Sequence, residues 1–278
     1  MSGIFWLASY PKSGNTWLRI LIENYVRNEA QPIDINTLPP PNVAYGRGLI
    51  DDLLGVESAS LPDERIDLLR PRLYETVAAS AAFRFVRTHE QHRSNSNGDS
   101  VFSTQATKGV VLLVRNPLDI AVSLAHFMAV TVEEAADLLA DENYTLYPQH
   151  TGITCQLPQR VGSWSTHTRS WMESGLPLHL VKYEDLVADT HRYFTRIVDF
   201  LDLPVDGDRV SRAVAHSTID VLQSQESAGD FRELKTGAGK FFRQGQANRW
   251  MCDLPEPLAD RILSRHHALI TELAYSGL

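Results

Sequence analysis

The sequence predicts an α/β fold in which a parallel sheet is flanked by helices, within one domain that spans residues 1–278. Apolar stretches of strand length alternate with segments of helical periodicity. The strongest strand signal, GVVLLV at 109–114, is apolar without a break, which is typical of a strand covered on both faces of a parallel sheet. A chain of 278 residues can bury one sizeable core, and no linker divides it.

The chain opens with a strand, a loop and a helix. Residues 3–9, GIFWLAS, predict a short buried strand. The segment TWLRILIENYV, residues 16–26, is expected to be helical. Its apolar stripe consists of Leu18, Leu21, Ile22, Tyr25 and Val26. Residues 10–15 then form a loop at the C-terminal end of the first strand, and residues 31–48 are Pro-rich and irregular.

A second helix and strand are expected before the strongest strand. DERIDLLRPRLYETV, residues 63–77, predicts a helix that is broken near Pro71. FRFVRTH, residues 83–89, predicts a strand. The polar, turn-rich stretch at 90–100 is expected to be mobile.

A helix start follows the strongest strand. Asn116 is suited to cap a helix at 118–128, with Pro117 in the first helical position and Asp119 near the positive end of the helix dipole. The remaining predicted elements are a helix at 160–174, a short strand within 176–186, a helix at 190–203 that ends before Pro204, and a helix at 256–275.

Composition disfavours several classes of protein. The net charge of −8 and the pI of about 5.7 are unlike those of a nucleic-acid binder. Cys155 and Cys252 have no zinc or redox spacing, so a reducing compartment is the simplest interpretation. No secretory signal is found, nor an apolar run of the ~20 residues that a membrane helix needs. We expect a cytoplasmic protein without nucleic-acid or membrane partners, and the sequence does not fix its oligomeric state.

The stretch YPKSGNTW, residues 10–17, has the composition of a loop that holds phosphate. Gly14 permits a tight turn, so that backbone N–H groups of the loop and the helix start can point at an anion. Further donors are the side chains of Lys12, Ser13, Asn15 and Thr16. The usual nucleoside-triphosphate loop needs two glycines, with its lysine after the second, and this loop differs. The alternative is an ordinary strand–helix turn with polar surface groups.

Three further stretches carry groups suited to anion binding or proton transfer. Arg115 leaves the strongest strand, with Ser123 two turns further on, and its guanidinium can form a bidentate pair with phosphate. His89 follows a strand, where open α/β sheets place ligands, and can act as a general base. Arg243 precedes Gly245 in FFRQGQANRW. Taken singly, these also fit a solvated arginine, a structural histidine and a surface loop.

Together, the stretches resemble the sulfotransferase family that uses 3′-phosphoadenosine 5′-phosphosulfate (PAPS). YPKSGNTW is similar to that family's 5′-phosphosulfate loop, YPKSGTTW, and RNPLDIAVS to its 3′-phosphate motif. RTH is similar to the KTH around the catalytic histidine, VKYEDL to the tyrosine motif, and FFRQGQANRW to RKGxxGDW. The motifs follow the family order from residue 10 to residue 250, so the resemblance covers nearly the whole chain.

The resemblance implies a P-loop-like fold and a soluble, cytosolic-type enzyme of the bacterial small-molecule kind. The reaction is transfer of a sulfuryl group, SO₃, from PAPS to a hydroxyl of a small-molecule acceptor, in preference to an amine, without a metal. The residues implied to bind the cosubstrate are Lys12, Ser13, Gly14, Asn15, Thr16, Trp17, Arg115, Ser123, Tyr183, Thr218, Arg243, Gln244 and Gly245. Of these, Trp17, Tyr183 and Thr218 are implied to lie near the adenine.

The resemblance also implies catalytic roles. His89 removes the proton of the acceptor, whose oxygen then attacks sulfur in line. Lys12 stabilises the charge on the bridging oxygen, and Ser123 restrains Lys12 before the acceptor binds. The strongest strand ends in Arg115 rather than in an acidic metal ligand, which agrees with a second phosphate monoester instead of a magnesium triphosphate.

The sequence departs from the family motifs at three places. Arg87 stands for the lysine before Thr-His, which keeps the charge and changes the geometry. Gln244 replaces the lysine of RKG, and Asn248 with Arg249 replaces the Gly-Asp pair. We expect weaker cosubstrate binding unless another cation, such as Lys240, compensates.

Two other functions remain open beside this one. A protein that binds PAPS or its product without catalysis would not need both Lys12 and His89. A small-molecule kinase would need the second glycine and the acidic metal ligand that this chain lacks. The acceptor itself is poorly encoded, since its walls are expected from residues 31–60, 126–160 and 225–242, with His126 and Phe127 beside it.

Overall fold

The computed structural model describes most of the chain. The described residues are 3–38, 43–80, 84–147, 156–229, 231–233, 240–243 and 245–275. The chain forms two compact units. The first consists of Met1–Tyr10, Pro40–Leu112 and Asp141–Leu180, and the second of Pro11–Pro39, Leu113–Ala140 and Val181–Leu278.

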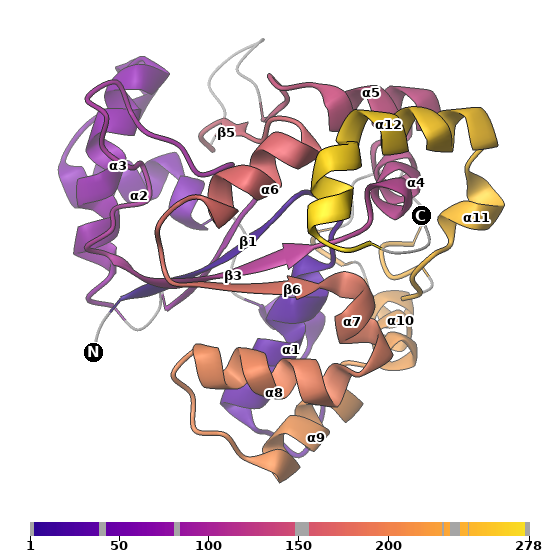
Figure 1. Ribbon diagram of the computed structural model, residues 1–278. Coiled ribbons are helices and arrows are strands. Elements are labelled where there is room, and N and C mark those ends of the chain that lie inside the picture. Colours follow the sequence, from indigo (N-terminus) through magenta and orange to yellow (C-terminus); the bar gives the residue numbers. More distant parts are fainter. Residues whose placement is uncertain are drawn as a thin grey trace. The chain divides into compact units, whose positions relative to one another are not determined.

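A four-stranded sheet has the order β2-β1-β3-β6. Its strands are β1 (Ile4–Ser9), β2 (Phe85–Thr88), β3 (Thr107–Val114) and β6 (Leu178–Lys182) (Figure 1). The strands β1 and β2 pair in parallel, with Phe5 opposite Phe85. Every residue of β1 is buried, as are the last six of β3, because helices cover both faces of such a sheet. The predicted α/β fold with a parallel sheet is therefore confirmed.

The first unit adds helices and a small antiparallel pair to the sheet. Its further elements are α2 (Arg47–Leu54), α3 (Asp63–Val77), β4 (Thr145–Leu146), β5 (Gln159–Arg160), α6 (Trp164–Met172) and three-residue 3₁₀ helices at Val43–Tyr45 and Ser58–Ser60. The predicted break at Pro71 is wrong, because α3 continues through that residue. Buried side chains on both sides of it, such as Ile66 and Tyr74, hold the two halves on one core and compensate for the missing N–H.

The second unit is mainly helical. Its helices are α1 (Asn15–Arg27), α4 (Pro117–Met128), α5 (Val132–Ala140), α7 (Tyr183–Ala188), α8 (Thr190–Phe200), α9 (Gly207–Ala215), α10 (Ile219–Ala228), α11 (Trp250–Asp253) and α12 (Glu256–Glu272), with a 3₁₀ helix at Ile35–Thr37. In Figure 1, α4, α5 and α12 pack side by side, and α8 lies next to α9. Asn116 caps α4 as predicted, since its Oδ1 accepts a hydrogen bond of 2.8 Å from the Leu118 N–H.

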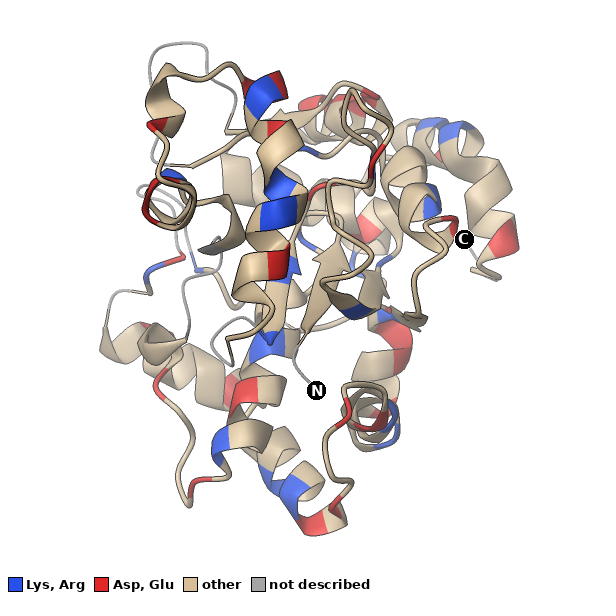
Figure 2. Ribbon diagram, turned by 90° about the vertical axis from the view of Figure 1, so that its left-hand side faces the viewer, with Lys and Arg blue, Asp and Glu red and all other residues tan. Residues whose placement is uncertain are grey.

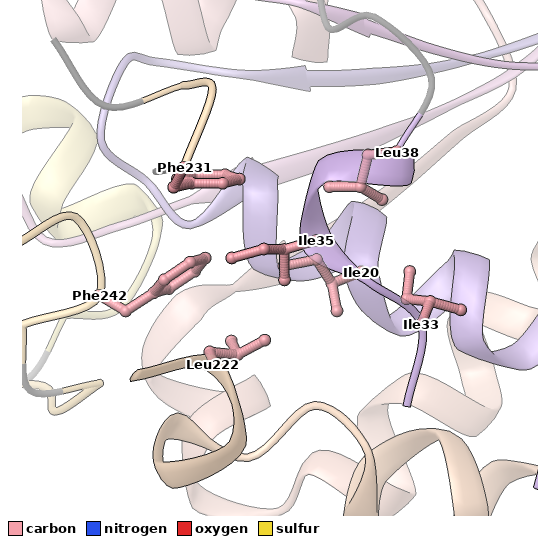
Figure 3. Close-up of a cluster of buried hydrophobic side chains, with 7 residues drawn as sticks. All are labelled: Ile20, Ile33, Ile35, Leu38, Leu222, Phe231 and Phe242. Carbon is pink, nitrogen blue, oxygen red and sulfur yellow. The ribbon is translucent and has the colours of Figure 1, made fainter. Parts of the chain in front are cut away.

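The apolar stripe of α1 follows the prediction except at its end. Leu18, Leu21, Ile22 and Tyr25 are buried, whereas Val26 is 40% exposed. On the neighbouring face, Ile20 joins a cluster that includes residues far away in the sequence (Figure 3). The cluster comprises Ile20, Ile33, Ile35, Leu38, Leu222, Phe231 and Phe242. It fixes the helix that begins at the loop predicted to hold phosphate.

Figure 2 shows basic and acidic residues interspersed along the helices. Within the described residues, no helix combines the length and the apolar character needed to cross a membrane.

Candidate functional site

The loop between β1 and α1 has the strained backbone of an anion-binding turn. We call residues 11–17 the anion loop. Gly14 caps α1 with φ of 98°, and Lys12 also has a positive φ, of 69°. A Cβ at Gly14 would lie 2.7 and 2.8 Å from two ring carbons of Tyr183. Only glycine therefore fits this position, and it lets the first N–H groups of α1 face outward toward an anion.

Side chains of the anion loop supply further donors. Ser13 is fully buried, and among the described residues its Oγ has no hydrogen-bond partner. Asn15 is the first residue of α1 and is buried. The hydroxyl of Thr16 donates to Glu233 Oε2 over 2.9 Å, and Arg19 Nη1 lies 2.7 Å from Glu233 Oε1. The start of α1 thus already holds one negative group, and a buried hydroxyl there remains free for an anion.

The ammonium of Lys12 lies between two aromatic rings. Its Nζ is 4.0 Å from the ring centroid of Phe127 and 4.5 Å from that of Phe241. Such contacts stabilise a cation through the negative faces of the rings. Ser123 lies four residues before Phe127 and therefore on the same face of α4. Its restraint of Lys12 stays a prediction.

Arg115 connects the anion loop to the C-terminal segment. Its Nη1 donates to the Lys12 carbonyl over 3.1 Å, and its Nη2 donates to the Gln246 carbonyl over 3.4 Å. The guanidinium lies 4.4 Å from the ring centroid of Tyr183 and 3.7 Å from Asp119 Oδ2. With its side chain only 13% exposed, Arg115 is a cation held in place beside the loop, as a 3′-phosphate ligand must be.

Asp119 holds the segment that carries one departure from the family motif. Its carboxylate accepts hydrogen bonds from the N–H groups of Asn248, at 2.8 Å, and Trp250, at 3.0 Å. Asn248 has φ of 62°, in the left-handed region that asparagine tolerates better than most residues. The asparagine in place of the family's glycine therefore keeps the backbone turn, and this departure does not disrupt the segment.

The remaining C-terminal residues lie against α10. Gln223 Nε2 donates to the Arg243 carbonyl over 2.6 Å. The side chain of Arg243 is exposed. Gly245 has φ of 60°, and a Cβ there would lie 3.2 Å from the Ile219 side chain. Arg243 and Gly245 therefore both lie against α10. Gln244 lies outside the described residues.

The three residues expected near the adenine also gather in the second unit. The rings of Trp17 and Tyr183 meet edge to face, with centroids 5.9 Å apart. Trp17 Nε1 donates to the Ser217 carbonyl over 2.9 Å, and the next residue, Thr218, caps α10. Two aromatic faces and a helix start are suited to stack a base and to bind its polar edge.

His89 belongs to the first unit and has a defined ring orientation. We call residues 88–92, which begin at the last residue of β2, the base segment. His89 Nδ1 lies 2.8 Å from the Ser9 carbonyl and 3.3 Å from the Ser9 hydroxyl. Because a carbonyl only accepts, Nδ1 carries the hydrogen, and Nε2 of the neutral ring keeps its lone pair. That tautomer is the one that a general base needs.

Two other histidines are possible bases. Burial lowers the pKa of His92, whose Nε2 lies 3.0 Å from the Ser100 hydroxyl. The pKa of His126 is lowered by burial, then by Arg243 and Lys12. His126 therefore shares its surroundings with the cations of the second unit. Both rings are therefore poorer proton acceptors than an ordinary histidine.

Sequence reasoning missed a buried ionic network beside His89. Glu90 is fully buried and pairs with Arg70 over 2.6 Å and with Arg93 over 2.7 Å. Arg93 also lies 2.6 Å from Asp67. These contacts show that the stretch expected to be mobile is held firmly at its beginning. Arg70 also lies 3.2 Å from Asp67, so a leucine in place of Glu90 would leave this buried guanidinium with Asp67 as its remaining ionic partner in the network.

Most of the predicted cosubstrate residues therefore come together in the second unit. The residues described there are Lys12, Ser13, Gly14, Asn15, Thr16, Trp17, Arg115, Ser123, Tyr183, Thr218, Arg243 and Gly245. The sequence did not indicate that Glu233 and Phe241 contact this set. Both are more than 200 residues from the anion loop, Glu233 belongs to no motif, and Phe241 opens FFRQGQANRW ahead of the residues that match the family motif. In the described residues no cluster of three or more His, Cys, Asp or Glu side chains forms a metal site.

Known proteins similar to this chain are sulfotransferases. Rat sulfotransferase 2A2 is 26% identical over 252 residues, which cover 88% of this chain and 76% of the relative. Cytosolic sulfotransferase 12 of Arabidopsis thaliana is 28% identical over 269 residues, covering 92% of this chain and 74% of the relative.

Two solved structures have the same fold. Mouse sulfotransferase SULT7A1 complexed with PAP superposes with a TM-score of 0.60 at 18% identity, covering 99% of this chain and 89% of that one. Retinol dehydratase in complex with androsterone and the inactive cofactor PAP gives a TM-score of 0.62 at 21% identity, covering 96% and 80%. The P-loop-like arrangement expected from the sequence is confirmed.

The family model for the sulfotransferase domain matches residues 3–272, which is nearly the whole chain. This match confirms the resemblance carried by YPKSGNTW and RNPLDIAVS, and with it the predicted class of PAPS-dependent sulfotransferase. The chain belongs to the sulfotransferase domain family.

Proposed function

We propose that this protein transfers a sulfuryl group from PAPS to a hydroxyl of a small molecule, in one catalytic domain, with His89 as the base. The observation that carries the proposal is the anion loop. It combines a glycine that no other residue can replace, a buried Ser13 hydroxyl and a Lys12 ammonium. These groups suit a phosphosulfate, whose charge must be stabilised at its bridging oxygen as the bond to sulfur breaks.

The donor fits the residues of the second unit. The 5′-phosphosulfate would bind the anion loop, and the 3′-phosphate would bind Arg115, Ser123, Arg243 and the N–H of Gly245. Arg115 supports this assignment, because it is already fixed by two carbonyls and a ring beside the loop. The base would lie against the aromatic pair Trp17 and Tyr183 and the start of α10 at Thr218. The contribution of Gln244 stays a prediction.

The reaction then follows from the proton and charge balance. Nε2 of His89 accepts the proton of the acceptor hydroxyl, and the acceptor oxygen forms a bond to sulfur. The bond between sulfur and the bridging oxygen breaks, and its electron pair leaves with adenosine 3′,5′-bisphosphate (PAP). Lys12 stabilises the negative charge on that oxygen. No metal is needed in this scheme, because fixed cations supply the charge.

A small, mainly apolar molecule is the acceptor that the relatives suggest. Retinol dehydratase has been solved with androsterone and with retinol, each together with PAP. Phe127 and Phe241 supply apolar surface around Lys12 in this chain. The relatives called cytosolic, together with the lack of a membrane-spanning helix in the described residues, support the proposed cytoplasmic location.

One experiment separates this function from its alternatives. The protein is incubated with ³⁵S-labelled PAPS, or with labelled ATP, and a panel of phenols, alcohols and amines. Label transferred from PAPS to an alcohol or phenol is the expected result. Binding of PAPS without transfer to any acceptor would indicate a non-catalytic binding protein, and transfer of phosphate from ATP would indicate a kinase. The lack of an acidic residue at the end of β3, where Arg115 follows, argues against the kinase.

A further inference from the structure

The backbone of the base segment is fixed immediately around His89. The His89 N–H donates to Gln159 Oε1 over 3.2 Å. One residue later, the Glu90 carbonyl accepts a hydrogen bond of 3.0 Å from Trp171 Nε1. The Glu90 N–H donates to the Thr88 hydroxyl over 3.0 Å. Both peptide units that flank the base are therefore tied to side chains.

The next two residues are held by the same distant part of the chain. The Gln91 N–H donates to the Arg160 carbonyl over 2.9 Å, and the His92 N–H donates to the Ser170 hydroxyl over 2.9 Å. Every N–H from residue 89 to residue 92 thus has a partner, and three of the four partners lie between residues 159 and 171. The backbone that follows the base is therefore held mainly by a segment about 70 to 80 residues further along the chain.

Burial, helix capping and aromatic packing hold these partners in place. Gln159 and Trp171 are both fully buried, so the bonds that they make are shielded from water. Ser170 and Trp171 lie on α6, whose first turn is capped by Ser163 through a 3.2 Å bond from the Thr166 N–H. The indole of Trp171 also packs on the Phe102 ring, with centroids 4.7 Å apart. Because these side chains are fixed by their packing, their hydrogen bonds resist a displacement of the base segment.

We propose that Gln159 and Trp171 are positioning residues for His89. Gln159 holds the peptide unit that precedes the histidine, and Trp171 holds the carbonyl of the next residue, Glu90, so that Nε2 keeps a fixed direction before the acceptor arrives. The inference rests on the proposed role of His89 as the base. A base that takes a proton from a neutral hydroxyl must lie within hydrogen-bond reach of it, and a displacement of 1 Å can cost about 100-fold in rate.

The test compares two substitutions on α6. Trp171→Phe removes the N–H that bonds to the Glu90 carbonyl but keeps an aromatic ring on Phe102. Trp164→Phe makes the same change at another fully buried tryptophan of the same helix. We expect Trp171→Phe to lower turnover of an aliphatic alcohol by about 10- to 100-fold, with PAP affinity unchanged in calorimetry, whereas Trp164→Phe should retain turnover. Gln159→Met removes the acceptor of the His89 N–H and should act like Trp171→Phe.

The choice of acceptor separates positioning from a general loss of packing. A phenol that is already ionised at the assay pH needs no base, so Trp171→Phe and Gln159→Met should lower its sulfation much less than that of the alcohol. Equal losses for both acceptors, or the same loss in Trp164→Phe, would overturn the inference. If Trp171→Phe does not fold, Gln159→Met carries the test alone.

A His89→Ala variant, measured in parallel, separates the test of the proposed base from the test of the proposed positioning residues. Normal alcohol sulfation by His89→Ala would overturn the proposed base itself. A loss of turnover in His89→Ala with normal turnover in Gln159→Met and Trp171→Phe would leave the base in place and overturn only the positioning. A selective loss of alcohol sulfation in all three variants supports both.

Discussion

The base segment and the anion loop differ in whether their hydrogen-bonding groups already have partners. In the base segment each backbone N–H from residue 89 to residue 92 has a hydrogen-bond partner, and the ring of His89 is held in a single tautomer by the Ser9 carbonyl. In the anion loop, Lys12 and Gly14 have positive φ, a buried hydroxyl lacks a partner, and a carboxylate lies where an anion is expected. The difference follows from what each must do. A base has to be oriented beforehand, whereas an anion site must keep donors available for its ligand.

The largest effect should come from the base segment. His89→Ala removes the proposed base, and we expect turnover of neutral alcohols to fall by about 10²- to 10⁴-fold with PAP affinity nearly unchanged. The measurement is turnover at saturating PAPS, beside His92→Ala and His126→Ala. If His92→Ala or His126→Ala loses turnover while His89→Ala retains it, the base has been assigned to the wrong histidine.

The second effect concerns the anion-binding side. Arg115→Ala removes the proposed charge-assisted bond to the 3′-phosphate, which should weaken PAP binding by about 1.5–3 kcal/mol. Calorimetry with adenosine 5′-phosphate is the control, because that ligand has no 3′-phosphate and should bind variant and parent alike. An equal loss for both nucleotides would mean that Arg115 supports the loop through the Lys12 carbonyl and does not contact the 3′-phosphate.

These two predictions differ in how far the sequence alone supports them. The anion loop is local: the eight contiguous residues YPKSGNTW specify a strand end, a turn and a helix start, so the place of Gly14 in the turn could be predicted. Arg115 likewise follows directly from the strongest strand signal. The partners of His89 could not, since Ser9 precedes it by 80 residues and Gln159 follows it by 70. Side-chain contacts at such separations depend on the packed fold and leave no periodic signal in one sequence.

Two departures from the prediction have the same origin. Pro71 carries a real local preference to end a helix, but buried neighbours on both sides of it keep α3 continuous. The segment after β2 is polar, which suggests mobility, yet its glutamate belongs to an ionic network with Arg70 and Arg93. In both cases contacts between side chains of the folded chain outweigh the preference of the local sequence.

The third prediction uses pH to probe the core around the base segment. Burial lowers the pKa of His167 to about 3, against a smaller opposing effect of the His89 backbone. The unfolded chain binds a proton there below about pH 6.5 and the native protein does not. The free energy of unfolding should therefore decrease by roughly 1.4 kcal/mol per pH unit as the pH falls from about 6.5 toward 3. Burial also lowers the pKa of His266, to about 4, and adds to the decrease.

Urea denaturation at pH 7 and pH 5 measures this effect. A His167→Gln variant should lose the part of the pH dependence that comes from this ring, while the part from His266 remains. Equal stability of the parent protein at the two pH values would show that His167 is not neutral in the folded state.

The smallest expected effect concerns Glu233, whose carboxylate lies at the start of α1, where the phosphate of the cosubstrate is expected to bind. The Glu233 carboxylate accepts from Thr16 and pairs with Arg19, and only 12% of its side chain is exposed. A phosphate bound at the start of α1 would bring a second negative charge beside it, so cosubstrate binding has to overcome this repulsion or displace the glutamate. Glu233→Gln keeps the shape and removes the charge. We expect PAP to bind more tightly by about 1 kcal/mol, or roughly fivefold.

The matched control is Glu23→Gln on the same helix. Glu23 pairs with Arg27 on the surface over 2.6 Å and does not contact the anion loop, so its loss should leave PAP affinity unchanged.

Calorimetry with PAP at two salt concentrations supplies the measurement, because the gain in Glu233→Gln should decrease as salt screens the repulsion. The free protein should also become less stable to heat, since Arg19 loses its ion pair with Glu233 in a site where only 8% of its side chain is exposed. Unchanged or weaker PAP binding in Glu233→Gln would show that this carboxylate helps to build the loop. Tighter binding together with lower stability would show that it occupies the place of the ligand, and that the anion loop, unlike the base segment, is completed only when its substrate binds.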